Sequence, residues 1–168
     1  MKKNNKGFSY VELILVMAIM AILVAMVSIS MGVVSRSNVN RGAERLNASL
    51  NKARNAAMAK GTDRGTIEIT CDGSKYYCFV GSSTSTNKIA ERQEIGASPM
   101  VVGYYLKGNS EMITIQAGTP LILKYNQSTG AFKELSGGGY CDKIVFTNGS
   151  STAEIKLYSA TGKTELIY

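Results

Sequence analysis

The N-terminal sequence Lys6-Gly7-Phe8-Ser9-Tyr10-Val11-Glu12 leads into 22 uncharged residues, Leu13 to Val34. These residues are almost all Leu, Ile, Val, Met and Ala. At about 1.5 Å per residue they would form a helix of about 33 Å, matching a hydrocarbon core of about 30 Å. Glu12 is the exception, because a charge near the bilayer centre costs roughly 2.5–3.5 kcal/mol. The sequence therefore predicts a membrane-length helix whose carboxylate needs a partner.

The positive charge of the chain is concentrated in its N-terminal part. The 168 residues carry a net charge of +7, and residues 1–64 hold 10 Lys and Arg against 3 Asp and Glu. Residues 65–168 hold 9 of each and are neutral. Three lysines precede the apolar run, a pattern typical of a segment whose N-terminus stays in the cytoplasm. We expect the remainder of the chain to face outward.

The helix is expected to continue beyond the apolar run to residue 60. Small and apolar residues recur there every three or four positions, forming one stripe: Ala43, Leu46, Leu50, Ala53 and Ala57. Lys60-Gly61 supplies a basic last turn and a helix-stopping glycine. This second half is amphipathic and requires a cover over its stripe.

From Gly65 the pattern changes to β-strands. Alternating or β-prone runs occur at residues 66–70, 75–80, 100–106, 113–115, 121–125, 143–147, 153–158 and 164–168. Asn148-Gly149 and Thr161-Gly162-Lys163 are hairpin-type turns. We predict an α+β fold in which the long N-terminal helix packs against a single antiparallel sheet system in a C-terminal head. The expected segments are a leader (1–7), a transmembrane helix (8–35), an amphipathic helix (36–61) and a β-rich head (62–168).

The residues that could carry chemistry are few. The chain has no histidine, so the commonest general base is missing, and no CxxC pair suggests a metal site. We expect no catalysis, no cofactor and no metal. Cys71 and Cys78 flank a turn-like sequence, and a turn centred on Ser74-Lys75 would place the two thiols opposite each other. A disulfide between them and buried free thiols both remain open.

Two other functions fit part of the sequence. An ordinary secretory signal would be cleaved after Ser28-Ile29-Ser30, but Glu12 interrupts its apolar region and the helix pattern runs past that site. Residues 36–64 hold seven basic and two acidic residues, so DNA binding is a second alternative. The same charges suit lipid headgroups or neighbouring subunits, and the neutral head lacks a concentrated basic patch.

The sequence Lys-Gly-Phe-Ser-x-Val-Glu followed by an apolar run resembles the class III signal of type IV pilins and type II secretion pseudopilins. The resemblance implies cleavage between Gly7 and Phe8 by a membrane prepilin peptidase, followed by N-methylation of the Phe8 amine. It also implies that Glu12 pairs with the N-terminal amine of a neighbouring subunit. Tyr10 departs from the usual leucine.

A second resemblance covers the end of the helix. Arg45-Leu46, Ala48, Leu50, Ala53-Arg54, Ala56 and Ala59-Lys60-Gly61 look like the H-type minor pseudopilins and their minor-pilin relatives. The implied protein is a structural subunit of a type IV pilus or pseudopilus, anchored in the cytoplasmic membrane with its head outside until it enters a fibre. Its implied partners are the peptidase, other pilin subunits and the membrane assembly platform. A DNA- or surface-binding minor pilin and a secreted β domain are the alternatives.

Overall fold

The computed structural model describes residues 9–81 and 91–168, and the side chains of all of these except residues 26–35. The chain forms two compact units, Met1–Val34 and Ser35–Tyr168. The predicted leader 1–7 and Phe8 lie outside the described residues. The fold is α+β, as predicted, with an N-terminal helix followed by antiparallel sheets.

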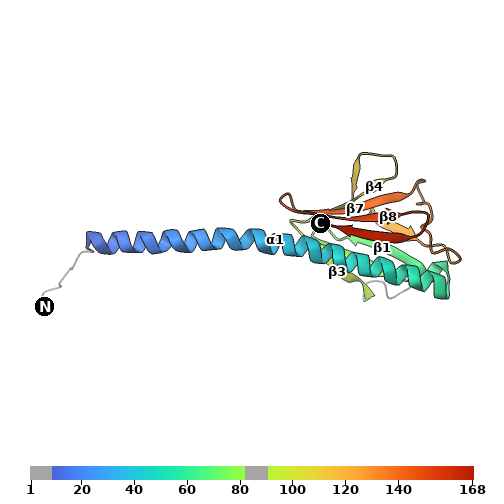
Figure 1. Cartoon of the computed structure of the whole chain (residues 1–168), viewed down its shortest axis with the longest axis horizontal. Coiled ribbons are helices and arrows are strands. Elements are labelled where there is room, and N and C mark those ends of the chain that lie inside the picture. Colours follow the sequence, from blue (N-terminus) through green and yellow to red (C-terminus); the bar gives the residue numbers. More distant parts are fainter. Residues whose placement is uncertain (1–8, 82–90) are drawn as a thin grey trace. The chain divides into compact units, whose positions relative to one another are not determined.

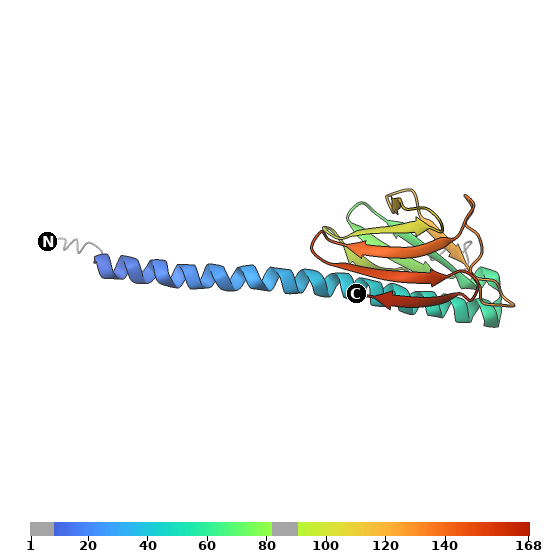
Figure 2. The same ribbon diagram turned by 45° about the horizontal axis from the view of Figure 1, so that its top comes forward.

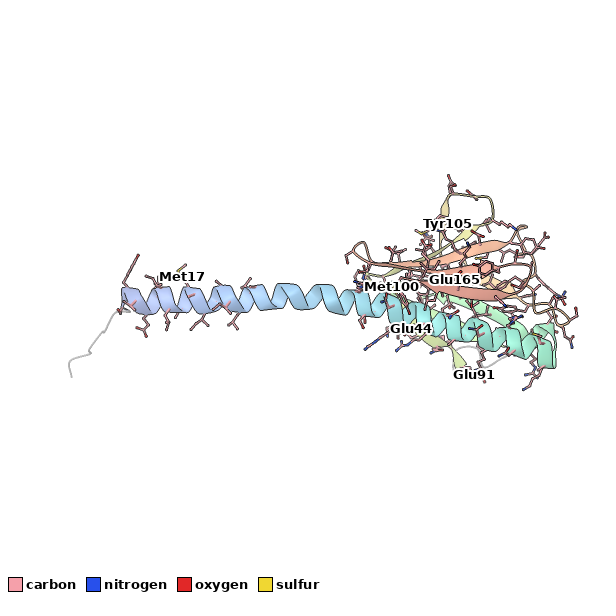
Figure 3. All side chains as sticks on the ribbon, in the orientation of Figure 1. Met17, Glu44, Glu91, Met100, Tyr105 and Glu165 are labelled. Carbon is pink, nitrogen blue, oxygen red and sulfur yellow. The ribbon has the colours of Figure 1, made fainter. Side chains whose placement is uncertain are left out.

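The first unit consists of the N-terminal part of helix α1 (Tyr10–Lys60). The helix begins where the Leu13 amide donates to the Ser9 carbonyl oxygen at 3.1 Å. Large apolar side chains project from all sides of this part, including Met17 (Figure 3). In the part of α1 whose side chains are described, no stretch is both long and apolar enough to cross a membrane.

The second unit contains the C-terminal part of α1, which runs along the strands in both views (Figures 1 and 2). The predicted stripe is confirmed, because Ala43, Leu46, Leu50, Ala53 and Ala57 are all 0% exposed. Val39, which the sequence analysis did not include, is also 0% exposed. The helix ends at Lys60, where the Gly61 amide donates to the Ala57 carbonyl oxygen at 2.9 Å and Gly61 adopts a φ of 100°. A glycine at this position is a common helix stop because it tolerates a positive φ.

Nine strands and one short 3-10 helix follow α1 in the described residues. Their bounds are η1 Thr62–Gly65, β1 Thr66–Cys71, β2 Lys75–Val80, β3 Gln93–Ala97, β4 Val101–Leu106, β5 Met112–Thr114, β6 Leu121–Lys124, β7 Cys141–Thr147, β8 Thr152–Tyr158 and β9 Lys163–Ile167. All strand pairs are antiparallel. The turns predicted at Asn148-Gly149 and Thr161-Gly162 connect β7 to β8 and β8 to β9.

The prediction of a single sheet was wrong. The strands form a four-stranded sheet in the order β3-β2-β1-β6 and a five-stranded sheet in the order β5-β4-β7-β8-β9. Strand β6 is responsible, because it pairs with β1 across more than fifty residues of sequence instead of with its neighbour β5. Strand β3 was not predicted at all, since Glu94, Gly96 and Ala97 are poor strand formers.

The two sheets and the helix share one hydrophobic core. Its buried members extend from Val39 on the helix to Leu157 on β8, so the whole core lies inside the unit Ser35–Tyr168. A fragment of residues 36–168 therefore retains all the residues of this core.

Glycines allow the helix to approach the strands closely. A Cβ at Gly42 would collide with the carbonyl oxygen of Ile95 on β3, and a Cβ at Gly65 would collide with Ala57. Gly42 weakens the helix by about 1 kcal/mol relative to alanine. In return it leaves the space in which the backbone of the helix packs closely on the strand. The backbone of α1 can lie directly against β3 at this point.

Candidate assembly segment and head surface

Glu12 lies in the first turn of α1, on the exposed apolar part of the helix. The N-terminus of a helix carries a partial positive charge, which favours a carboxylate there by about 0.3–1 kcal/mol. That contribution falls short of the several kcal/mol that burial of an unpaired carboxylate costs. Glu12 is the only charged residue between Ser9 and Val34. The segment therefore combines an apolar helix surface with one charge that needs a partner if the surface is buried.

The apolar side chains around Glu12 are uncovered within their own unit. Twelve large apolar residues between Tyr10 and Val24 are 46–79% exposed. They face every direction around the helix, so no single stripe distinguishes a buried face from a polar one (Figure 3). A helix that is apolar all round is characteristic of a segment buried in lipid or among other helices.

The comparison with known families identifies this segment. Residues 2–28 match the family model of the prokaryotic N-terminal methylation motif. The chain carries the class III signal of type IV pilins. No curated protein and no solved structure gives a significant match. The pilin-like signal covers the leader and the first part of α1, and the head has no such counterpart.

The class III signal supports a type IV pilin-like prepilin substrate. Such a signal implies processing by a prepilin peptidase and assembly with pilin subunits. It does not test the individual residues predicted above. Cleavage between Gly7 and Phe8, methylation of Phe8 and pairing of Glu12 stay predictions.

The cysteines of the head are not arranged as the predicted hairpin required. Strand pairing places Cys71 opposite Tyr76 and Cys78 opposite Ile69, so the turn is centred on Gly73-Ser74. The two cysteines are diagonal neighbours, which are typically about 7–8 Å apart between Cα atoms and exceed the usual disulfide separation. All three cysteines of the chain are free.

Two of these thiols belong to the core. Burial raises the pKa of the Cys78 thiol, which donates to Ser49 Oγ at 3.4 Å. Burial also raises the pKa of Cys141 to about 12. Thiols in such surroundings are poor nucleophiles because the thiolate is disfavoured. Within residues 9–81 and 91–168, no group of three metal-ligating side chains comes together.

The head also contains a polar cleft that the sequence did not predict. It has a volume of about 230 Å³ and lies between α1 and the β3–β4 connection. Arg41 and Arg45 line it from the helix, and Ser98 and Asn148 line it from the strands' connections. The i, i+4 spacing of the arginines is visible in the sequence, but the residues opposite them lie fifty or more positions away. Their proximity follows only from the fold.

Proposed function

We propose that the chain, after removal of residues 1–7, is a structural subunit that enters a type IV pilus-type fibre through the N-terminal part of α1. The observation that carries this proposal is the single carboxylate Glu12 in the first turn of an exposed, wholly apolar helix bearing the methylation motif. Before assembly the same helix anchors the precursor in the cytoplasmic membrane, with the head outside.

The apolar side chains and Glu12 contribute free energies of opposite sign and different size when this helix is buried. Fully burying a large apolar side chain contributes about 1.5–3 kcal/mol. Half of that gain over the twelve exposed side chains amounts to roughly 10–20 kcal/mol, against several kcal/mol for desolvating one carboxylate. Removal of this surface from water therefore keeps the helix in the membrane or among the helices of a fibre, whereas packing between helices and the charge of Glu12 decide which arrangements of helices are tolerated.

The partner of Glu12 in this proposal is the Phe8 amine of a neighbouring subunit. Cleavage after Gly7 creates that amine, so the uncleaved precursor has no equivalent charge at this position. Two desolvated charges that meet with good geometry offset each other's cost, whereas one alone remains strongly unfavourable. Assembly would thereby be restricted to processed subunits in one axial register.

We predict that Glu12→Ala leaves membrane insertion and cleavage intact but abolishes incorporation into fibres. Glu12→Gln keeps the shape of the side chain and removes its charge, so it should fail in the same way. Immunoblots of sheared fibres and of the membrane fraction measure both steps. Met17→Leu, which alters the same exposed surface without a charge change, is the matched control and should assemble normally.

Normal incorporation of both Glu12 variants would contradict the pairing proposal. If Glu12→Ala fails to enter fibres but Glu12→Gln enters them normally, the shape of the side chain and not its charge is required at this position. Either result leaves the apolar assembly surface standing.

The resemblance of residues 45–61 to H-type proteins supports a minor-pilin or pseudopilin role. The absence of a proline from Leu13 to Val34 supports it as well, because major pilins commonly carry a helix-disturbing proline in this half. A minor subunit should be present in purified fibres at a small fraction of the major subunit, as measured by quantitative mass spectrometry. Equal or greater abundance would indicate a major pilin.

A further inference from the structure

The cleft beside α1 has the composition of an anion site. Asn38, Arg41 and Arg45 line it from the helix. Ser98, Met100 and Asn148 line it from outside the helix. Figure 3 shows Met100 next to the part of α1 that carries Glu44. Hydrogen-bond donors thus line a space of about 230 Å³ together with Glu94, whose carboxylate is paired with Lys75.

Close packing of α1 on β3 fixes one arginine at the edge of this cleft. Gly42 lets the helix backbone approach the carbonyl oxygen of Ile95. The guanidinium of Arg45 then donates from Nη1 to the carbonyl oxygen of Glu94 at 3.2 Å. Because a guanidinium has five N–H groups, this bond orients Arg45 and leaves donors for a ligand.

Glu94 also lines the cleft, but neither arginine pairs with a carboxylate in the described residues. Arg41 and Arg45 lie one helical turn apart, where like charges repel. The carboxylate of Glu94 accepts from Lys75 Nζ at 2.8 Å, and that of Glu44 accepts from the Tyr168 hydroxyl at 2.8 Å. No ion pair to either arginine forms among residues 9–81 and 91–168. An anion between the two guanidinium groups would relieve their repulsion.

We propose that this cleft binds the phosphate of an anionic phospholipid headgroup and holds the head on the membrane surface before assembly. The proposal rests on the function proposed above, because it requires a membrane-anchored precursor. Guanidinium groups match phosphate oxygens in a two-bond fork, so Arg41 and Arg45 would each engage the phosphate. In the sequence the two arginines follow the end of the apolar run at Val34 by seven and eleven residues.

Two features favour a headgroup over nucleic acid. The donors lie inside a small concave space, whereas a DNA backbone requires an extended basic surface that tracks successive phosphates. The head beyond residue 64 carries equal numbers of basic and acidic residues and therefore offers no continuation of such a surface.

Vesicle sedimentation of the fragment 36–168 tests the proposal. The fragment retains the whole buried core. It should bind phosphatidylcholine vesicles containing phosphatidylglycerol and fail to bind phosphatidylcholine alone. A basic residue near an anionic surface contributes about fivefold in affinity, so Arg41→Gln with Arg45→Gln should weaken binding by roughly 25-fold. Arg41→Gln alone should weaken binding about fivefold, and it leaves the Arg45–Glu94 bond untouched.

Lys60→Gln with Arg64→Gln is the matched control, since it removes the same charge from the opposite end of the helix segment. This control should weaken vesicle binding less than threefold. Equal losses in the two double variants would overturn the cleft and indicate binding by net charge. Tighter binding to duplex DNA than to the vesicles at the same salt concentration would also overturn it.

Inorganic phosphate distinguishes the two sources of the ligand. If free phosphate saturates the cleft at a concentration that releases no fragment from the vesicles, the cleft is an anion site independent of the headgroup. That result would overturn the membrane lipid as the source of the phosphate. If phosphate competes with the vesicles for the fragment only at a large excess, the lipid headgroup is the ligand. Because the fragment lacks Glu12, failure of this experiment is distinguishable from failure of fibre assembly.

Discussion

Gly162 illustrates how single residues determine the packing of the head. It adopts a φ of 65°, and a Cβ there would collide with the carbonyl of Gly130, which also accepts from Arg54 Nε at 3.3 Å. This contact joins the β8–β9 turn to the loop after β6 and to the helix. Gly149 has a similar φ of 86° but open space around it.

The two glycines form a matched pair for a stability measurement. Gly149→Ala should cost only the left-handed backbone term of about 1–2 kcal/mol. Gly162→Ala adds the steric clash with Gly130 and should cost about 2–5 kcal/mol. Urea denaturation of the fragment 36–168 measures both. Equal destabilisation by the two substitutions would show that the turn moves freely away from Gly130.

Tyr125 places an unsatisfied hydroxyl in the core. Its side chain is 0% exposed and its ring centroid lies 4.4 Å from that of Phe132. Among the described residues no group bonds its hydroxyl. A buried hydroxyl without a partner costs about 1–3 kcal/mol, so Tyr125→Phe should stabilise the fragment 36–168 or leave it unchanged. One hydrogen bond contributes about 1 kcal/mol net to stability. If Tyr125→Phe destabilises the fragment by more than about 1 kcal/mol in thermal unfolding, the hydroxyl has a hydrogen-bond partner.

The same residue predicts an alkaline pH dependence. Burial raises the pKa of Tyr125 above its ordinary value of 10.0. The folded state then retains a proton that the unfolded state loses, so stability should fall as pH rises above about 10. Tyr125→Phe should flatten this part of the curve of unfolding free energy against pH. An unchanged slope would contradict the assignment.

At the level of elements, the helix stripe is the main support of the head. Leu46 and Leu50 are fully buried in the core that the helix shares with both sheets, and truncating such a side chain leaves a cavity. Leu50→Ala should destabilise the fragment 36–168 by about 2–5 kcal/mol. The neighbouring Asn51 is exposed, and Asn51→Ala should change stability by about 0.5 kcal/mol or less. Similar effects of the two substitutions would contradict the packing of this stripe.

The elements show which sequence signals suffice and which do not. The stripe from Ala43 to Ala57 and the stop at Gly61 were predictable, because helical periodicity and glycine capping are local. Strand β3 was missed because burial of Ile95 in the core outweighs the weak strand propensity of its neighbours. The two-sheet arrangement and the register of Cys71 and Cys78 depend on pairing between distant segments, which local patterns do not encode.

At the level of the whole molecule, the features for assembly and the features of the folded head lie in different units. The first unit holds the class III signal, Glu12 and the exposed apolar surface. The second holds a closed core and a cleft with two arginines. Glu12 was identifiable from sequence because a charge beside an apolar run is conspicuous. The cleft could not be identified from the sequence, because only the fold brings Ser98 and Asn148 into the same lining as Arg41.

The N-terminus of the mature protein, determined by sequencing and intact mass, decides whether the chain is processed as a prepilin. We predict a chain that starts at Phe8 with a methylated amine, and a Gly7→Val variant that accumulates unprocessed. A chain that starts at Met1 or at Met31, or a Gly7→Val variant with the same mature mass, would contradict it.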